Sequence, residues 1–407
     1  MVYKKTDREV IIFDPHYDPT DVKFSLTILQ EKFVNQAAKR DDLRLKIVVP
    51  DENSIHQHLY YHSVKETGKR IWGVDTDFIG VSHDKYSETS CDKVNLSWKK
   101  IAKEKDYYVY FTPRIRGAFD LVNLVQKGYV FKPTLVLWLI YDHQSQPWFS
   151  LNYKLKEMVS FAMVNFRTIF TNQMIFSQWH NYIKKLYSPA LIKKFEDNSL
   201  VINLGIDCDL IDKVRSKKKN DIFTFVYGGR LTKIKGIDVM IEIVEKLNAI
   251  GKRCNLDLFL TLDDDADKDL LKMIEGKSYI NVYKNPKEQA IFLNGATRAH
   301  AYLCPCQIES YGMSWLEMMY AGCVGIYLRK DWQKNVLPAN YPFLANNKTE
   351  LLTIASYVYD NYNKIDTKRF VDYVFNEHNT RVNMNKIADY LRDLSYKIKT
   401  KEVKSDL

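Results

Sequence analysis

Two carboxylates in the C-terminal half of this 407-residue chain have the type and spacing to hold a phosphorylated sugar. Glu309 and Glu317 lie eight residues apart, after the apolar run Ala301–Cys304 and on either side of Gly312. The order predicts a strand, a turn and a helix start, whose unpaired N–H groups and positive dipole end suit a phosphate. Helical side chains lean toward the helix N-terminus, so Glu317 reaches hydroxyls of a ligand seated there. A phosphate site beside two carboxylates that accept hydrogen bonds from hydroxyl groups matches the chemistry of a nucleotide-sugar.

A glycine-rich segment earlier in the chain offers positive charge. The run Phe223–Tyr227 is followed by Gly228, Gly229 and Arg230, and then by Lys235 at the start of a helical pattern. Glycines allow close backbone approach, arginine grips phosphate oxygens with two N–H groups, and lysine adds a compact charge. A glycine-ended strand followed by solvated basic residues is the alternative interpretation.

Short apolar runs alternate with segments of helical period throughout, which predicts a parallel α/β architecture. Strands are expected at Val10–Phe13, Leu45–Val49, Phe78–Val81, Tyr107–Phe111, Leu135–Tyr141, Thr168–Thr171, Leu200–Ile202, Phe223–Tyr227, Leu256–Leu260, Ile280–Tyr283, Ala301–Cys304 and Gly325–Leu328. Helical patterns include Gly236–Leu247, Lys287–Ala296 and the segment from Arg381 on. The polar, basic stretch Asp212–Asn220 is the expected joint between the halves.

Three elements in order resemble the GT4-like group of retaining glycosyltransferases with the GT-B fold. They are Asn203-Leu204-Gly205-Ile206-Asp207, then Gly229-Arg230 with Lys235-Gly236, then Glu309 and Glu317. The resemblance implies two Rossmann-like domains whose parallel sheets face across a cleft, followed by a C-terminal helix. Residues 1–205 would bind the acceptor, residues 206–380 would bind the nucleotide-sugar, and residues 381–407 would form the helix and tail.

The same resemblance assigns roles to the donor residues. Arg230 and Lys235, beside Gly229, would grip the diphosphate, and Glu309 would contact sugar hydroxyls. Glu317 would accept from the ribose, although a first-turn carboxylate that complements the helix dipole is the alternative. The segment Ser310, Tyr311, Gly312 and Met313 completes the donor site, with the amides of the last three at the distal phosphate. Ser310 replaces the glycine that is commoner after the first glutamate.

The expected strand Leu135–Tyr141 ends at Asp142 and His143. A histidine at a strand's carboxyl end can bond the transferred sugar or orient the acceptor hydroxyl, and the resemblance places one there. We therefore take His143, Asp142 and Glu309 as the catalytic residues; a structural histidine is the alternative. The loop from Asp14 to Asp21 departs from the glycine-rich loop usual in the group.

Two further stretches, Val22–Leu26 and Lys132–Thr134 with Asp142-His143, are similar to the phage hydroxymethylcytosine glycosyltransferases. This resemblance implies transfer from a UDP-sugar, glucose or arabinose, to 5-hydroxymethylcytosine in double-stranded phage DNA. A net charge of +10 fits a polyanionic partner, and Arg114 and Arg116 are the expected phosphate contacts. An extruded base would stack on an aromatic ring, and the candidates are Trp138, Trp148, Phe149 and Trp179. Packing in a core or at its rim is the commoner role of such residues.

Two other functions remain open: a GT4-like enzyme acting on a cell-surface glycan or glycolipid, and a non-catalytic DNA-binding protein on a GT-B frame. No cofactor and no metal site are expected, because neither the acidic run Asp263–Asp267 nor the pair His58 and His62 completes a ligand set. The six cysteines show no disulfide spacing. The longest apolar run, Thr134–Tyr141, is too short to span a bilayer, and the N-terminus lacks a signal-peptide core. We expect no stable membrane insertion and a cytoplasmic location, in the host if the chain is phage-encoded.

Overall fold

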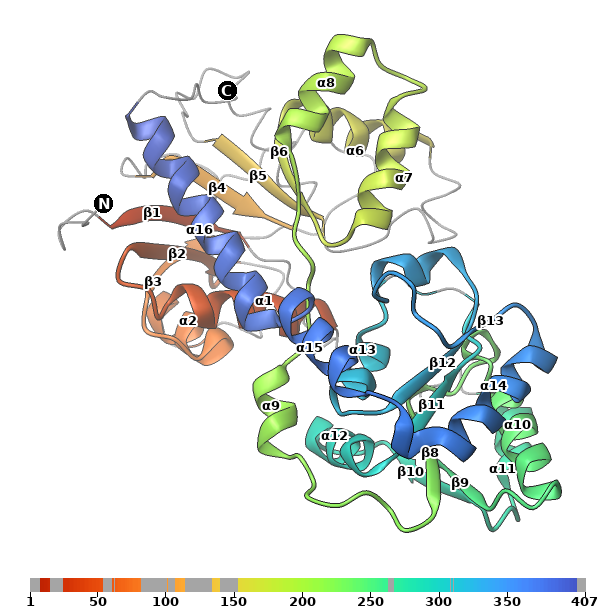
Figure 1. The fold of residues 1–407 in the computed structure, drawn as a ribbon. Helices are drawn as coiled ribbons and strands as arrows, with labels where there is room; N and C mark the ends of the chain where they lie inside the picture. The colour runs from red at the N-terminus through yellow and green to blue at the C-terminus, as the bar shows by residue number, and fades with distance from the viewer. Residues whose placement is uncertain are drawn as a thin grey trace. The chain divides into compact units, whose positions relative to one another are not determined.

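The chain forms two compact units, which are described separately. The computed structural model describes residues 8–14, 25–53, 61, 63–81, 101, 107–113, 134–139, 153–262, 267–307, 309 and 311–400. One unit comprises Met1–Leu204 together with Arg381–Leu407, and the other comprises Gly205–Thr380. The chain therefore passes between the units twice, at residues 204–205 and 380–381 (Figure 1).

The first unit contains a seven-stranded parallel sheet with the order β3-β2-β1-β4-β5-β6-β7. Its strands are β1 Glu9–Phe13, β2 Leu43–Pro50, β3 Asp77–Val81, β4 Val109–Thr112, β5 Thr134–Leu139, β6 Arg167–Phe170 and β7 Ser199–Val201. Its helices are α1 Ser25–Ala37, α2 Val64–Trp72, α6 Tyr153–Asn165, α7 Gln173–Ile183, α8 Pro189–Asn198 and α16 Thr380–Lys399. Every strand expected in this half is confirmed, with ends that differ by one or two residues within the described range.

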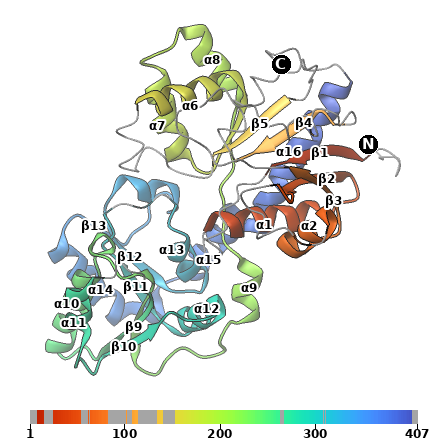
Figure 2. The same cartoon turned by 180° about the vertical axis from the view of Figure 1, so that it is seen from behind.

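The core of the first unit explains its apolar strands. All six residues of β5 are buried, as is typical of an interior strand of a parallel sheet that is covered on both faces. Trp138 on this strand stacks on Phe111, with ring centroids 5.4 Å apart. Trp179 lies in a second cluster, within the group formed by α6, α7 and α8 (Figure 2). Both indoles are core residues, so the interpretation of either as a base-stacking platform is wrong.

Helix α16 follows the whole second unit in the sequence but packs on the first (Figure 1). Five of its apolar side chains, at helical spacing, are buried: Met384, Ile387, Ala388, Leu391 and Leu394. Ser395 and Lys399 donate hydrogen bonds of 2.7 and 3.3 Å to the buried carboxylate of Glu9 on β1. The helix therefore covers the start of the central strands.

Asp42, just before β2, ties α16 to the sheet through charge. Arg40 donates to both carboxylate oxygens at 2.8 Å, and Arg392 of α16 donates at 2.6 Å. These hydrogen bonds, from Arg40 first, lower the pKa of Asp42 from 3.8 to about 2. A carboxyl group whose pKa is lower in the folded state stabilises the fold fully above its unfolded pKa, and this contribution is lost as pH falls toward the folded value.

We expect the free energy of unfolding of the first unit to fall by at most about 2 kcal/mol between pH 4 and pH 2 because of Asp42. Urea titrations over this pH range measure the loss of unfolding free energy, and amide hydrogen exchange in α16 localises it. Asp42→Asn should lack this part of the pH dependence. The exposed neighbour Asp41 provides the control: Asp41→Asn should keep the pH dependence of the wild type. Identical pH dependence in wild type and Asp42→Asn contradicts the assignment.

The second unit contains a six-stranded parallel sheet with the order β10-β9-β8-β11-β12-β13. Its strands are β8 Phe223–Arg230, β9 Cys254–Thr261, β10 Ile280–Lys284, β11 Ala301–Cys304, β12 Val324–Leu328 and β13 Leu344–Ala345. Its α-helices are α9 Cys208–Lys213, α10 Ile237–Ala249, α11 Lys268–Ile274, α12 Gln289–Arg298, α13 Met313–Tyr320, α14 Lys348–Asn361 and α15 Lys368–Glu377. Short 3-10 turns are η3 Lys233–Lys235, η4 Asp331–Asn335 and η5 Tyr362–Lys364.

Helices cover the two faces of this sheet: α10, α11 and α14 lie along one, and α12 and α13 along the other (Figure 1). All five strands expected here are confirmed. The expected joint at Asp212–Asn220 is wrong, because this stretch lies inside the second unit and Asp212 and Lys213 end α9. Its polarity reflects a surface connection between α9 and β8. Among the described residues, none of the helices is long and apolar enough to cross a bilayer.

Candidate functional site

The expected donor residues gather where two neighbouring strands end. β8 and β11 pair in parallel, so their carboxyl ends lie at the same edge of the sheet. Lys235 follows β8 and Glu309 follows β11, and Lys235 Nζ lies 2.5 Å from Glu309 Oε2. Their side chains are only 16% and 17% exposed. The structure thus brings together two residues that the sequence places 74 positions apart.

The turn after β8 is held in one conformation by a tyrosine. Tyr227 Oη donates a 2.8 Å hydrogen bond to the carbonyl of Arg230. Gly229, with φ of 153°, leaves room for this bond, because a Cβ there would lie 2.8 Å from the tyrosine oxygen. The Arg230 side chain is exposed, and its guanidinium makes no hydrogen bond to a described residue. Arg230 therefore presents an uncommitted cation next to the Lys235–Glu309 pair.

The start of α10 lies directly against the loop after β11. Gly236 has φ of 71°, and a Cβ on it would come within 2.6 Å of Pro305. The Gln307 amide donates to the Ile234 carbonyl at 3.2 Å, which fixes the two loops together. Burial of the Lys235 ammonium opposes its charge, but the Glu309 carboxylate prevails and raises the pKa of Lys235. Lys235 is therefore a fixed positive charge at neutral pH.

The N-terminus of α13 has free backbone donors facing this region. Gly312 precedes the helix with φ of 77° and supplies no side-chain cap. The first helical bond runs from Leu316 N–H to the Gly312 carbonyl, so the amides of Met313, Ser314 and Trp315 lack a helical acceptor. These donors, at the positive end of the helix dipole, suit an anion.

Glu317, in the second turn of α13, is buried at 5% exposure. Gln289 of α12 donates a 2.6 Å hydrogen bond from Nε2 to Glu317 Oε1. This amide orients the carboxylate of Glu317. A side chain from a neighbouring helix therefore holds the carboxylate. A glutamate that only complemented the helix dipole would be exposed to solvent and would not need such a partner.

The side chain of Tyr311 has a structural role in the same loop. Its hydroxyl accepts from the Gly205 amide at 2.9 Å and lies 2.8 Å from His378 Nδ1. Burial lowers the pKa of His378 to about 4, so its ring is neutral at pH 7. One ring nitrogen therefore donates and the other accepts: Nδ1 meets the Tyr311 hydroxyl, and Nε2 lies 3.3 Å from Tyr373 Oη. Tyr311 thus connects the loop before α13 to the first residue of the second unit.

Gly205 is where the chain enters this unit, beside the segment where it leaves. Ile206 N–H donates to the His378 carbonyl at 2.7 Å, and Thr380 N–H donates to the Ile206 carbonyl at 3.0 Å. Gly205 has φ of 86°, and a Cβ on it would lie 2.6 Å from the Thr380 nitrogen. The glycine of the Asn-x-Gly-Ile-Asp run is therefore required by close backbone packing.

Other predicted site residues lie outside the described residues: Asp142, His143, Ser310, Arg114 and Arg116. The same holds for His58 and His62 and for most of the acidic run after β9. Its last member, Asp267, is described, and its side chain accepts from the Asp269 and Leu270 amides as the N-cap of α11. Within the described part of the chain, His, Cys, Asp and Glu form no group of three or more that could hold a metal.

Sequence reasoning missed Tyr227, Gln289 and His378. Tyr227 and Gln289 sit in an apolar run and at a helix start, and neither position carries a spacing signal. His378 is a lone histidine far from every motif. Only the three-dimensional contacts reveal their positioning roles.

Comparison with known proteins supports the architecture. No protein-family model matches the chain, and no curated protein matches its sequence. Solved structures do match over nearly the whole length. A glycosyltransferase from Rickettsia africae is 13% identical, with 95% of this chain and 98% of that one covered and a TM-score of 0.66.

HepE from Anabaena, in complex with UDP-glucose, is 12% identical, with 95% and 99% covered and a TM-score of 0.60. Sucrose-phosphate synthase from Thermosynechococcus elongatus is 13% identical, with 95% and 99% covered and a TM-score of 0.61. At these identities the likeness concerns the fold. The predicted architecture is confirmed: two sheets of parallel strands with surrounding helices and a C-terminal helix match the GT-B glycosyltransferases.

Proposed function

We propose that the chain is a retaining glycosyltransferase that takes its sugar from a UDP-sugar. The carrying observation is the Lys235–Glu309 pair beside the uncapped N-terminus of α13. Cations and amide donors suit a diphosphate, and the carboxylates of Glu309 and Glu317 suit sugar and ribose hydroxyls. HepE, a structure of the same fold, was solved with UDP-glucose.

The reaction needs charge stabilisation above all. The bond between the anomeric carbon and the diphosphate oxygen breaks, and its electrons leave with the UDP. The acceptor hydroxyl oxygen bonds to the anomeric carbon on the same face, and its proton passes to the leaving phosphate. Lys235, Arg230 and the amides of Tyr311, Gly312 and Met313 would stabilise the developing negative charge. Gly229 allows the backbone to approach the phosphates, and Ser310 lies in the same phosphate-binding loop.

For the acceptor, we propose 5-hydroxymethylcytosine in double-stranded DNA. The net charge of +10 and the segments similar to phage hydroxymethylcytosine glycosyltransferases support this choice. Arg114 and Arg116 would contact phosphates, and His143 with Asp142 would orient the acceptor hydroxyl. Such an enzyme would act in the host cytoplasm if the chain is phage-encoded, without membrane insertion or a cofactor.

The test is a donor screen on modified DNA. The protein is incubated with UDP-glucose or UDP-arabinose and a duplex that contains 5-hydroxymethylcytosine, and the digested nucleosides are weighed by mass spectrometry. A mass increase of one hexose or one pentose is expected. An unmodified duplex serves as the control. An unchanged nucleoside mass with both donors would contradict the proposal of a DNA acceptor.

A glycan or glycolipid acceptor is favoured by one surface feature. Leu186, in the connection between α7 and α8, and Leu191, on α8, are exposed. Exposed lysines flank them: Lys184, Lys185, Lys193 and Lys194. Basic and aliphatic side chains together suit the surface of an anionic membrane. Flotation with anionic liposomes, together with indifference to DNA, would select this acceptor class.

A further inference from the structure

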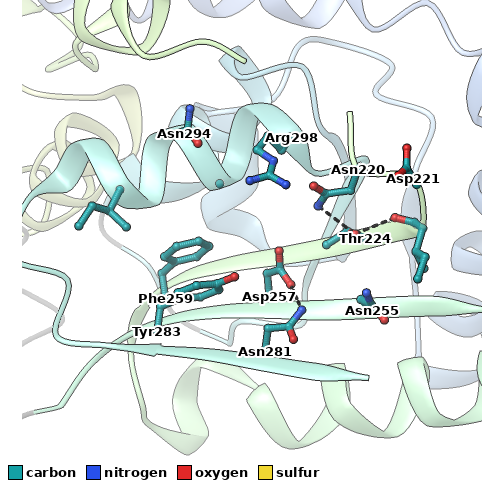
Figure 3. Close-up of a pocket in the computed structure, with 13 residues that line it drawn as sticks. Asn220, Asp221, Thr224, Asn255, Asp257, Phe259, Asn281, Tyr283, Asn294 and Arg298 are labelled. Carbon is teal, nitrogen blue, oxygen red and sulfur yellow. Dashed lines mark hydrogen bonds between the residues drawn. The ribbon is translucent and has the colours of Figure 1, made fainter. Parts of the chain in front are cut away.

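A pocket of about 410 Å³ lies in the second unit, on the face of its sheet that α12 covers (Figure 3). Strands β8, β9 and β10 form its floor and α12 forms one wall. The residues on the floor begin at the second position of each strand: Thr224, Asn255 and Asn281. The donor residues follow the carboxyl ends of β8 and β11. The pocket is therefore separate from the donor site.

Strand register arranges the floor in three rows. Thr224 pairs with Asn255, Asp257 pairs with Asn281, and Phe259 pairs with Tyr283. The alternate residues of β9, Leu256, Leu258 and Leu260, are buried on the other face. Strands of a sheet that is covered on both faces usually read as continuous apolar runs. Asn255 and Asp257 break this rule on the face beneath α12.

Asp257 is a buried carboxylate with acceptor capacity left over. It is 6% exposed, and Asn281 Nδ2 donates to its Oδ1 at 2.7 Å. Its other oxygen accepts no hydrogen bond from a described residue. Burial raises the pKa of Asp257, against the opposing effects of the Asn281 hydrogen bond and the Arg298 charge. The fold thus carries the desolvation cost of a carboxylate that the chain satisfies only in part.

Two further polar groups around Asp257 are uncommitted. The half-buried amide of Asn255 makes no hydrogen bond to any residue of the described ranges. Arg298 extends from α12 toward the sheet, and its guanidinium likewise bonds to none of them (Figure 3). The pocket therefore offers acceptors at Asp257 and Asn281 and donors at Asn255 and Arg298.

An aromatic surface closes one end. Phe259 and Tyr283 stack with ring centroids 4.4 Å apart and planes at 7°, and Tyr283 is 43% exposed. Gly295 of α12 sits on Phe259, because a Cβ there would lie 2.3 Å from its Cζ. A rigid aromatic surface beside a row of polar groups fits a ligand with one apolar face and several hydroxyls.

We propose that this pocket binds a small neutral carbohydrate. Asp257 and Asp221 disfavour an anion, and Arg298 disfavours a cation. Sugar hydroxyls both donate and accept, which satisfies Asp257, Asn255 and Arg298 together, while the C–H face of a pyranose packs against Tyr283. This assignment is independent of the proposed transferase activity.

Saturation-transfer NMR on the whole chain, with maltotriose, cellotriose and mannotriose at millimolar concentration, tests the proposal. At least one trisaccharide should bind, and excess UDP should not displace it. Asp257→Asn keeps the shape and the Asn281 contact, yet should weaken binding roughly tenfold, because a hydrogen bond to a charged group is lost. Arg298→Ala changes an exposed side chain that forms no hydrogen bond with a described residue, so it tests the site even if Asp257→Asn unfolds. Lys235→Ala should bind the trisaccharide like wild type.

Three results would overturn the assignment. One is the absence of saturation transfer to every trisaccharide. Another is binding that neither Asp257→Asn nor Arg298→Ala weakens. The third is binding of adenosine, added as a nucleoside probe, in preference to the sugars. If Lys235→Ala loses UDP binding but still binds the trisaccharide, the result concerns the donor site and agrees with a separate carbohydrate pocket.

Discussion

Replacing Lys235 with alanine should lower the rate of sugar transfer roughly 10²–10³-fold, as loss of one preorganised charge-stabilising group does elsewhere. The ammonium lies in a shielded position, 2.5 Å from Glu309, where a fixed charge acts more strongly than in water. The variant also leaves the Glu309 carboxylate without its cation. We therefore expect weaker UDP binding as well, measurable by calorimetry. UDP binding that depends on Lys235 would also argue against a non-catalytic DNA-binding protein.

The same 3-10 turn supplies a matched control. Lys233 is two residues earlier and 68% exposed, and its contact is a 3.6 Å ion pair with Asp267. Lys233→Ala removes the same charge at the surface and should leave the transfer rate within about twofold, since exposed ion pairs contribute little. Equal losses in the two variants would point to net charge and would contradict a specific role for Lys235.

Tyr311→Phe should lower the free energy of unfolding of the second unit by about 2–6 kcal/mol. The change removes one oxygen and leaves two buried groups, the Gly205 amide and His378 Nδ1, without their partner. Each such group costs about 1–3 kcal/mol. Urea denaturation measures the loss, and amide exchange at Gly205 and Ile206 localises it.

Tyr373→Phe is the control for that variant. Its hydroxyl meets the same histidine at 3.3 Å and is less buried, so its loss should cost under about 1 kcal/mol. A Tyr311→Phe protein as stable as Tyr373→Phe would show that the tyrosine does not hold the chain entry in place. UDP affinity should fall in Tyr311→Phe alone, because Tyr311 belongs to the loop before α13.

The strands were predictable because parallel sheets impose a simple pattern on the sequence. A run such as Leu135–Leu139 is buried on both faces, so all of its residues are apolar. The Gly229-to-Gly236 and Glu309-to-Glu317 spacings were informative for a related reason. They place charges after strands that turn out to be neighbours, and the Lys235–Glu309 contact follows from that adjacency.

Contacts between distant side chains could not be predicted in this way. The hydrogen bond from Gln289 to Glu317 depends on how α12 lies beside α13, which no local pattern encodes. The joint was misplaced for a similar reason. Polarity marks Asp212–Asn220 as surface, but the chain passes between the units at Leu204–Gly205, in a buried, hydrogen-bonded segment. From the sequence, the indoles of Trp138 and Trp179 could stack on a base or pack in a core. Only their burial in the structure shows that they are core residues.

The position of α16 has a consequence for biosynthesis. The ribosome delivers this helix only after all of residues 205–380, yet it supplies the partners of Glu9 and Asp42 near the start of the chain. Although domains generally fold in order from the N-terminus during translation, here the earlier one stays unfinished while the later one is made. A released chain truncated just before Arg381 should therefore have a protease-resistant second unit and a protease-sensitive first unit.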